Sequence, residues 1–111
     1  MLTLKRKDCA ILPLVLKRKW YDMIACNSNR EEYRDKKDYW TRRMSRWADN
    51  SKFHKLHPVV EFRLGYASSA PHMAFISSGF YERDGCYYPE WGEWPELHYF
   101  IPLEERVELE D

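Results

Sequence analysis

The segment CAILPLVL, residues 9–16, is apolar at every position and decides much of the expected fold. An uninterrupted apolar run of this length is typical of a strand that is covered on both faces. Pro13 lies inside the run, and a proline cannot donate a hydrogen bond to a neighbouring strand. We therefore expect this strand to lie at a sheet edge or to carry a bulge at Pro13.

Helices are predicted over residues 18–26 and 36–48. Asn27 ends the first, because asparagine tolerates the left-handed backbone of helix ends, and Asp35 is the expected N-cap of the second. Apolar residues recur at helical spacing in both segments and are expected to face the core. These stripes are Trp20, Met23 and Ile24 in the first helix, and Trp40, Met44 and Trp47 in the second.

The remaining strands are predicted from alternation and from turn-forming residues. Residues 31–34 form a short strand, and residues 58–66 a regular one, with Val60 and Tyr66 on one face and Glu61 and Arg63 on the other. Residues 73–83 predict a strand in which Gly79 indicates a bulge. Residues 89–95 read as an irregular aromatic loop, and residues 98–103 as a last strand that continues to residue 107. The pattern predicts one α+β domain over residues 1–111, a small mixed β-barrel with two helices packed against it.

Composition limits the environment and the partners. No apolar run approaches the roughly 20 residues of a membrane-spanning helix, so no membrane contact is expected. Three unclustered cysteines fit a reducing cytoplasm, and we expect no cofactor and a monomer or weak dimer. The net charge is zero, but residues 1–57 carry fifteen Lys and Arg against seven Asp and Glu, whereas residues 58–111 carry three against eleven. A basic face built from the first half would attract nucleic acid.

Several stretches together resemble the ASCH domain family, a branch of the PUA-like β-barrels, in its short single-domain bacterial and phage form. They are LKRKWYDMI at residues 16–24, EEYR at 31–34, YWTRRM at 39–44, RLGY at 63–66, EWG at 90–92 and FIPL at 100–103. The likeness spans nearly the whole chain. It implies a PUA-like barrel with a polar pocket and suggests RNA as a partner.

The central ASCH motif, Gly-x-Lys-x-x-Glu-x-Arg, falls on residues 27–34 and is altered in two places. Asn27 replaces the glycine, and both residues accept a positive φ. Asn29 replaces the lysine, which takes part in catalysis in those ASCH proteins that are amidohydrolases of acetylated cytidine. Those enzymes also carry Thr at the position of Glu32. The resemblance therefore implies that this chain lacks the amidohydrolase reaction, and whether it is an enzyme at all stays open.

Glu32 and Arg34 are the most specific candidates for a ligand-binding site. Residues two apart on a strand project from the same face, with Cα atoms roughly 6–7 Å apart. A carboxylate beside a planar guanidinium can read the edge of a nucleobase or bind a phosphate. The alternative is a structural ion pair that ties the strand to the second helix.

Other candidates surround this pair. Lys17, Lys19 and Arg43 are expected to contact phosphate, with a solvated charged face as the alternative. Arg63 is a further pocket cation or the ion-pair partner of Glu61. Aromatic residues can stack on a base, although core packing is the expected role of the tryptophans on helix stripes. The aromatic and acidic candidates for ligand binding are Tyr39, Tyr66, Glu90 and Trp91.

The leading hypothesis is a nucleic-acid-associated module that binds RNA or a modified nucleotide in a polar pocket. A small hydrolase or metal-dependent ribonuclease in the same pocket is the second, with Glu32 as the candidate catalytic residue and Glu90 as an oxygen ligand. A protein-interaction module with a vestigial pocket is the third. We predict no structural metal site, because His54 and His57 have no cysteine near them in sequence.

Overall fold

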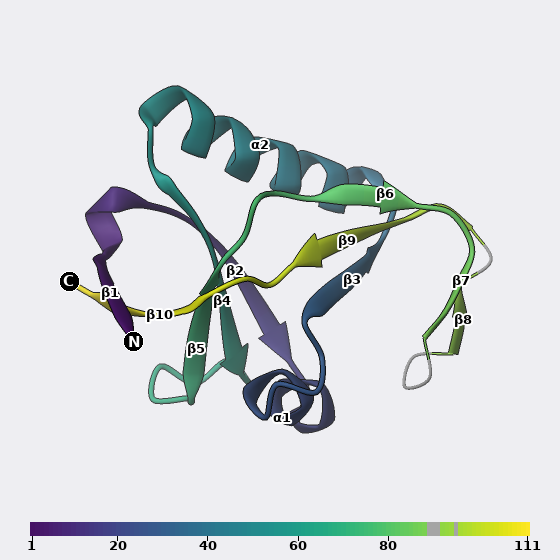
Figure 1. Ribbon diagram of the computed structural model, residues 1–111, viewed down its shortest axis with the longest axis horizontal. Coiled ribbons are helices and arrows are strands. Elements are labelled where there is room, and N and C mark those ends of the chain that lie inside the picture. Colours follow the sequence, from purple (N-terminus) through teal and green to yellow (C-terminus); the bar gives the residue numbers. More distant parts are fainter. Residues whose placement is uncertain (89–91, 95) are drawn as a thin grey trace.

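The apolar segment at residues 9–16 forms strand β2, Cys9–Leu16, in the computed structural model of the protein. β2 lies at one edge of a five-stranded sheet, so the expectation for Pro13 is confirmed (Figure 1). The structure describes residues 1–88, 92–94 and 96–111, and it describes side chains outside residues 86–95.

The elements follow one another along the chain in an order that mixes strands and helices. They are β1 (Leu2–Lys5), a 3-10 turn η1 (Arg6–Asp8), β2, α1 (Arg18–Ala25), β3 (Glu31–Asp35), α2 (Asp38–His54), β4 (His57–Leu64), β5 (His72–Ile76), β6 (Tyr81–Arg83), β7 (Cys86–Tyr88), β8 (Gly92–Trp94), β9 (His98–Pro102) and β10 (Arg106–Glu110). Of the described residues, no helix has both the length and the apolar content to cross a lipid bilayer.

The strands form sheets of five, three and two members. The five-stranded sheet has the order β1-β10-β5-β4-β2, the three-stranded sheet the order β3-β9-β6, and β7 pairs with β8. β2 runs parallel to β4, and β1 runs parallel to β10, which brings the two ends of the chain together (Figure 1). The α+β class with two packed helices is confirmed, but the described strands form separate sheets instead of one closed barrel.

The core lies between the five-stranded sheet, the β3-β9 pair and the two helices. Leu12 and Leu14 of β2, Val60 and Phe62 of β4, and Ile101 of β9 all contribute buried side chains to it. Burying apolar surface stabilises a fold by about 25 cal/mol per Å², so this layer supplies most of the driving force. α2 lies along one side of the molecule and α1 at the opposite end (Figure 1).

α2 also covers the free edge of β2. The indole Nε1 of Trp47 donates a hydrogen bond to the carbonyl of Ala10 at 2.9 Å, and Nη2 of Arg43 donates one to the carbonyl of Pro13 at 2.8 Å. Unpaired backbone groups at a sheet edge can recruit another strand, so a side-chain cover protects the edge. The cover also fixes Arg43 beside β2.

Two expectations for the helices need correction. Asp35 belongs to β3, and the N-cap of α2 is Lys37, whose side chain makes no capping hydrogen bond. α2 continues to His54, well beyond the expected end at residue 48, because the polar residues that follow Trp47 keep helical geometry on the solvent side. Asn27 ends α1 with a φ of 69°, as predicted.

The strand predictions were too long in three places. Residues 73–83 form two strands, β5 and β6, and the last predicted strand divides into β9 and β10, because the chain crosses from one sheet to the other at both breaks. β4 ends at Leu64, so Tyr66 does not continue the strand face of Val60 as predicted; it lies outside the strand and is 89% exposed. Strand β1 was not predicted. β8 occupies part of the expected aromatic loop, and residues 89–91 and 95 of that loop lie outside the described residues.

Gly79 joins β5 to β6 with a φ of +139°, which side chains other than glycine rarely adopt. Gly79→Ala is expected to lower the free energy of unfolding by about 1–2 kcal/mol. The cost comes from the backbone, because among the described residues a Cβ there would meet only the Tyr81 hydroxyl, at 3.9 Å. Urea unfolding measures the change, with Ser68→Ala in an exposed loop as the control. An unchanged stability for Gly79→Ala would contradict this assignment.

Candidate functional site

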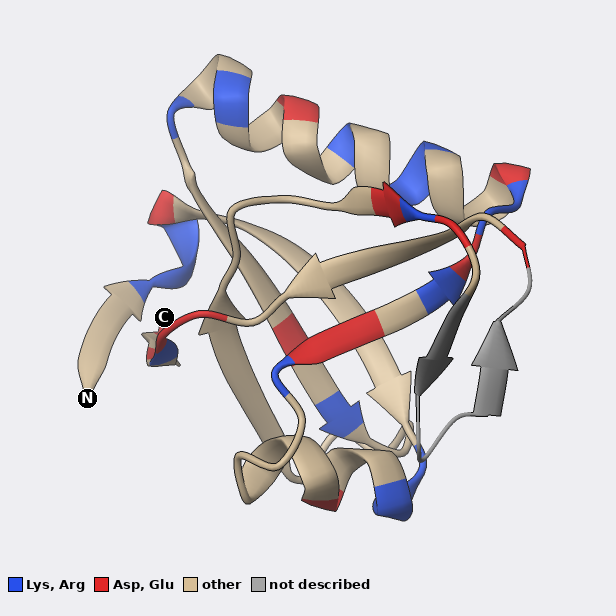
Figure 2. Cartoon of the chain, turned by 45° about the vertical axis from the view of Figure 1, so that its right-hand side comes forward, with Lys and Arg blue, Asp and Glu red and all other residues tan. Residues whose placement is uncertain are grey.

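Strand β3 places Glu32 inside the molecule. Glu32 pairs in register with Ile101 of β9, and its side chain has no exposed surface. One carboxylate oxygen, Oε1, accepts a hydrogen bond from the backbone N–H of Tyr33 at 2.8 Å. Burial raises the pKa of Glu32, because a low-dielectric surrounding disfavours the charged carboxylate, and the nearby Arg34 charge opposes this shift. Figure 2 shows β3 with an acidic start and one basic position before its last residue, the acidic Asp35.

Arg34 lies next to Glu32, but the two side chains do not satisfy each other. Nη2 of Arg34 is 3.5 Å from Oε2 of Glu32, which is an ion-pair distance without a hydrogen bond. Among the described residues, neither Oε2 of Glu32 nor the buried Nε of Arg34 has a hydrogen-bond partner. Buried polar atoms are nearly always paired in folded proteins, so an incomplete pair of this kind marks a place where a ligand or water can contribute. The two side chains therefore form an ion pair that hydrogen bonds between them do not complete.

Arg34 extends from Glu32 to a cavity of about 440 Å³ at the β2 edge. Five of the residues predicted from the sequence lie together here. The lining consists of Pro13, Leu14, Val15, Arg34, Tyr39, Trp40, Arg43, Arg63 and Tyr66. It contains three arginines and three aromatic side chains, and no acidic residue is among the described lining residues. The tertiary structure thus gathers β2, β3, β4 and the first turns of α2 around one cationic, aromatic space.

The indole ring of Trp40 contacts two of the arginines that line the cavity. The guanidinium carbon of Arg34 lies 4.9 Å from the indole ring, and that of Arg43 lies 5.2 Å from it. Arg43 also donates hydrogen bonds to the Tyr39 hydroxyl, at 3.3 Å, and to the Pro13 carbonyl. Tyr39 packs edge-on against Trp40 with ring centroids 4.9 Å apart. Cation–π contacts and hydrogen bonds to neutral groups hold Arg43 in place without neutralising its charge.

Arg63 differs from the other two arginines of the cavity. It is half-buried on β4 and forms no hydrogen bond or ion pair with any residue that the structure describes. The alternative partner, Glu61, is instead bound by Arg6, with Nη2 to Oε2 at 2.6 Å and Nη1 to Oε1 at 3.3 Å. Arg63 is therefore a pocket cation and not the ion-pair partner of Glu61.

Other candidates lie elsewhere. Lys17 precedes α1 and is exposed, and Lys19 lies 4.9 Å from the Trp20 ring. Neither lines the cavity. Glu90 and Trp91 lie outside the described residues.

Trp40 is the residue that sequence reasoning missed, because its place on the apolar helix stripe indicated core packing. It is half-buried at the end of that stripe, where α2 begins, and the neighbouring Tyr39 and Arg43 were the available signals.

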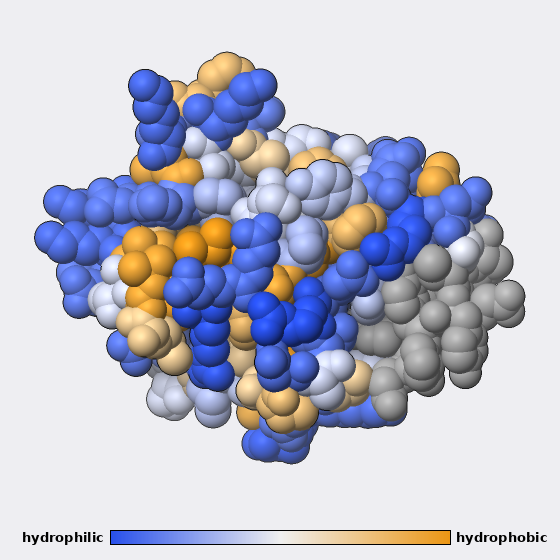
Figure 3. Space-filling model, in the orientation of Figure 1, coloured by the Kyte–Doolittle hydropathy of each residue, from blue (hydrophilic) through white to orange (hydrophobic). Residues whose placement is uncertain are grey.

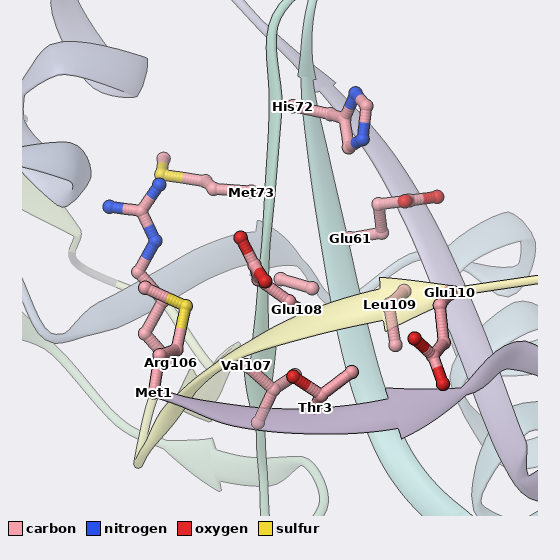
Figure 4. A pocket seen from close by; sticks show the side chains of 11 residues that line it. Met1, Thr3, Glu61, His72, Met73, Arg106, Val107, Glu108, Leu109 and Glu110 are labelled. Atoms are coloured by element: carbon pink, nitrogen blue, oxygen red, sulfur yellow. The ribbon is translucent and has the colours of Figure 1, made fainter.

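A second cavity, of about 330 Å³, lies between β1, β4, β5 and β10. Figure 4 shows Glu61 and His72 on one side of it and Arg106 and Met73 on the other, with Glu108 between them. Of the described residues that were predicted to bind a ligand, none lines it. Figure 3 shows apolar surface among hydrophilic residues at this end of the molecule.

No group of three or more His, Cys, Asp or Glu in the described part of the chain could hold a metal ion.

Comparison with protein-family models, with curated proteins and with solved structures gives no match for this chain. The candidate site therefore rests on its own geometry.

Proposed function

We propose that this protein is a nucleic-acid-associated binding module that holds RNA or a modified nucleotide in the cavity beside Arg34, Arg43 and Arg63. The observation that carries the proposal is the convergence of three guanidinium groups and three aromatic rings around a space with no acidic residue in its described lining. Guanidinium groups suit phosphate because their N–H donors form a planar fork. Aromatic rings suit nucleobases because each base offers a π-face for stacking.

The rim of the cavity is accessible to such a ligand. Tyr39 is 57% exposed, and Tyr66 is almost fully exposed on the loop after β4. Stacking of one base on an aromatic side chain contributes about 1–3 kcal/mol to binding. The likeness of residues 27–34 to the ASCH motif supports the same function, since the family implies a polar pocket around this strand.

Binding is favoured over hydrolysis by the position of Glu32. A general base must approach the proton that it abstracts to within about 3 Å, or act through one water. Glu32 has no exposed surface and does not line the cavity, so Arg34 stands between this carboxylate and a bound ligand. In the proposed site, Glu32 positions the Arg34 side chain by an ion-pair contact from the protein interior.

Filter binding of a short single-stranded RNA over a range of salt concentrations tests the proposal. We expect binding that weakens steeply with salt, with a slope of about −0.7 for each phosphate neutralised. Arg63→Gln is expected to weaken binding about tenfold, because it removes a charge-assisted contact.

Arg46→Gln is the matched control. Arg46 lies three residues beyond Arg43 on α2 but lines a separate surface hollow, so its loss is expected to change affinity less than threefold. No detectable RNA binding at low salt would rule out this function, as would equal losses in the two variants.

A further inference from the structure

The arginines around the cavity carry more positive charge than the described part of the chain neutralises. Three arginines line it, and among the side chains that the structure describes the one carboxylate in contact with them is that of Glu32, which lies 3.5 Å from Arg34. The partners of Arg43 are a carbonyl and a hydroxyl, and both are neutral. Arg63 has no charged partner among the described residues. At least two positive charges, on Arg43 and Arg63, are therefore available to a ligand.

An internal RNA phosphate and a terminal one differ in how they match this charge. A phosphodiester carries one negative charge, whereas a phosphate monoester carries about −1.5 to −2 at pH 7 and offers three acceptor oxygens. A diester would leave one of the two guanidinium groups uncompensated in a partly enclosed space. A monoester can be bound by both at once.

We propose that the cavity recognises a terminal phosphate monoester, carried by the end of a single-stranded RNA or by a free mononucleotide. This inference rests on the proposed nucleic-acid function and narrows its ligand to an end-phosphorylated chemical class. Arg43 and Arg63 bind the phosphate, and Arg34 supplies the third cation from β3. Tyr39 and Tyr66 flank the attached base at the rim.

The geometry suits a chain end in two further ways. Arg43 is locked by two hydrogen bonds and by its contact with Trp40, so ordering this side chain costs little when a ligand binds. The volume of about 440 Å³ falls within the range of about 300–1,000 Å³ typical of small-ligand sites. A terminal nucleotide enters such a space with a single continuing strand, whereas an internal nucleotide needs room for backbone on both sides.

Fluorescence competition with four unlabelled probes tests the inference on the full chain. The probes are one six-nucleotide RNA with a 5′-hydroxyl, the same RNA with a 5′-phosphate, the same RNA with a 3′-phosphate, and a nucleoside 5′-monophosphate. We expect at least one phosphorylated end to bind about tenfold or more tightly than the unphosphorylated RNA at pH 7.5. Arg63→Gln should remove most of this advantage, and Arg46→Gln should keep it.

The pH dependence of that ratio gives an independent readout. The second pKa of a phosphate monoester is about 6, so lowering the pH to about 5.5 should reduce the advantage of the phosphorylated RNA severalfold. Glu32 contacts Arg34, and His72 pairs in register with Arg63, so the comparison is repeated in Glu32→Gln and His72→Gln. The reduction should persist in both variants because the ligand is the group that titrates.

The possible outcomes separate this inference from the function on which it rests. Equal affinity for the three RNAs would overturn the monoester preference and leave RNA binding intact. No binding of any probe would overturn both. A mononucleotide that competes as well as the phosphorylated RNA identifies a free nucleotide as the ligand source, and a much weaker mononucleotide identifies an RNA end.

Discussion

Replacing Arg6 with alanine is expected to lower the free energy of unfolding by about 3 kcal/mol. The side chain of Glu61 is only 4% exposed, and Arg6 binds both of its carboxylate oxygens. Removing one member of a buried pair leaves the other charge without compensation, which typically costs about 3–5 kcal/mol. Arg6 is itself about one-third exposed, so we take the lower end of that range.

Arg6 also connects parts of the chain that are distant in sequence. Its Nε lies 3.3 Å from Oδ1 of Asp111, so one guanidinium joins η1, the centre of β4 and the residue after β10. Asp111 is almost fully exposed and adds little stability. The effect of Arg6→Ala therefore arises chiefly at Glu61.

Urea unfolding at pH 7 measures the effect of Arg6→Ala, and Arg18→Ala is its matched control. Arg18 faces Asp22 at 3.9 Å on the exposed side of α1, where an ion pair contributes well under 1 kcal/mol. The double variant Arg6→Ala/Glu61→Gln should recover part of the loss, because it removes the uncompensated carboxylate. Equal, small losses of unfolding free energy in Arg6→Ala and Arg18→Ala would contradict a stabilising ion pair between Arg6 and the buried Glu61.

Glu32→Gln is expected to change how stability depends on pH. Burial raises the pKa of Glu32 in the folded protein above its usual value of 4.5. Between that usual value and the raised one, the folded state holds a proton that the unfolded state has released. Stability therefore falls as the pH rises through this window, by up to about 1.4 kcal/mol per pH unit. Glutamine keeps the size and the Oε1 acceptor for Tyr33 and does not titrate.

The measurement is the difference in unfolding free energy between Glu32→Gln and the unchanged protein from pH 4 to pH 8. This difference should grow in favour of the variant as the pH rises. Glu31→Gln is the control with the opposite sign: burial acts to raise the pKa of Glu31, but hydrogen bonds from Arg83 and Tyr33 outweigh it and lower that pKa. The contribution of Glu31 is present above pH 4.5 and is lost as the pH falls. A Glu32→Gln difference that is flat over the whole range would contradict the burial of a titrating carboxyl.

The local features of the candidate site could be read from the sequence. Alternation along residues 31–34 predicts that Glu32 and Arg34 share a face, and the ion-pair distance between them agrees. A proline within an apolar run predicts a strand that lies at an edge or carries a bulge, and β2 lies at the edge. Such predictions succeed because the period of a strand or helix is set by backbone geometry over a few residues.

Contacts between residues far apart in the sequence could not be predicted from local patterns. The parallel pairing of β1 with β10 joins the two ends of the chain, and Arg6 meets Glu61 across 55 positions. Trp40 belongs to an apolar stripe, but its surroundings depend on where α2 begins relative to the β2 edge. A periodic pattern gives the direction of a side chain and carries no information about what lies opposite it.

By itself, the sequence determined the α+β class, the restriction of β2 to an edge or a bulge, and the shared face of Glu32 and Arg34, since each depends on residues close together in the chain. Only the tertiary structure decided that Arg34, Arg43 and Arg63 converge, that Glu32 stands behind them without exposed surface, and that the strands form separate sheets. Those outcomes depend on which distant segments pack together, and that choice is made by burial of apolar surface over the whole chain.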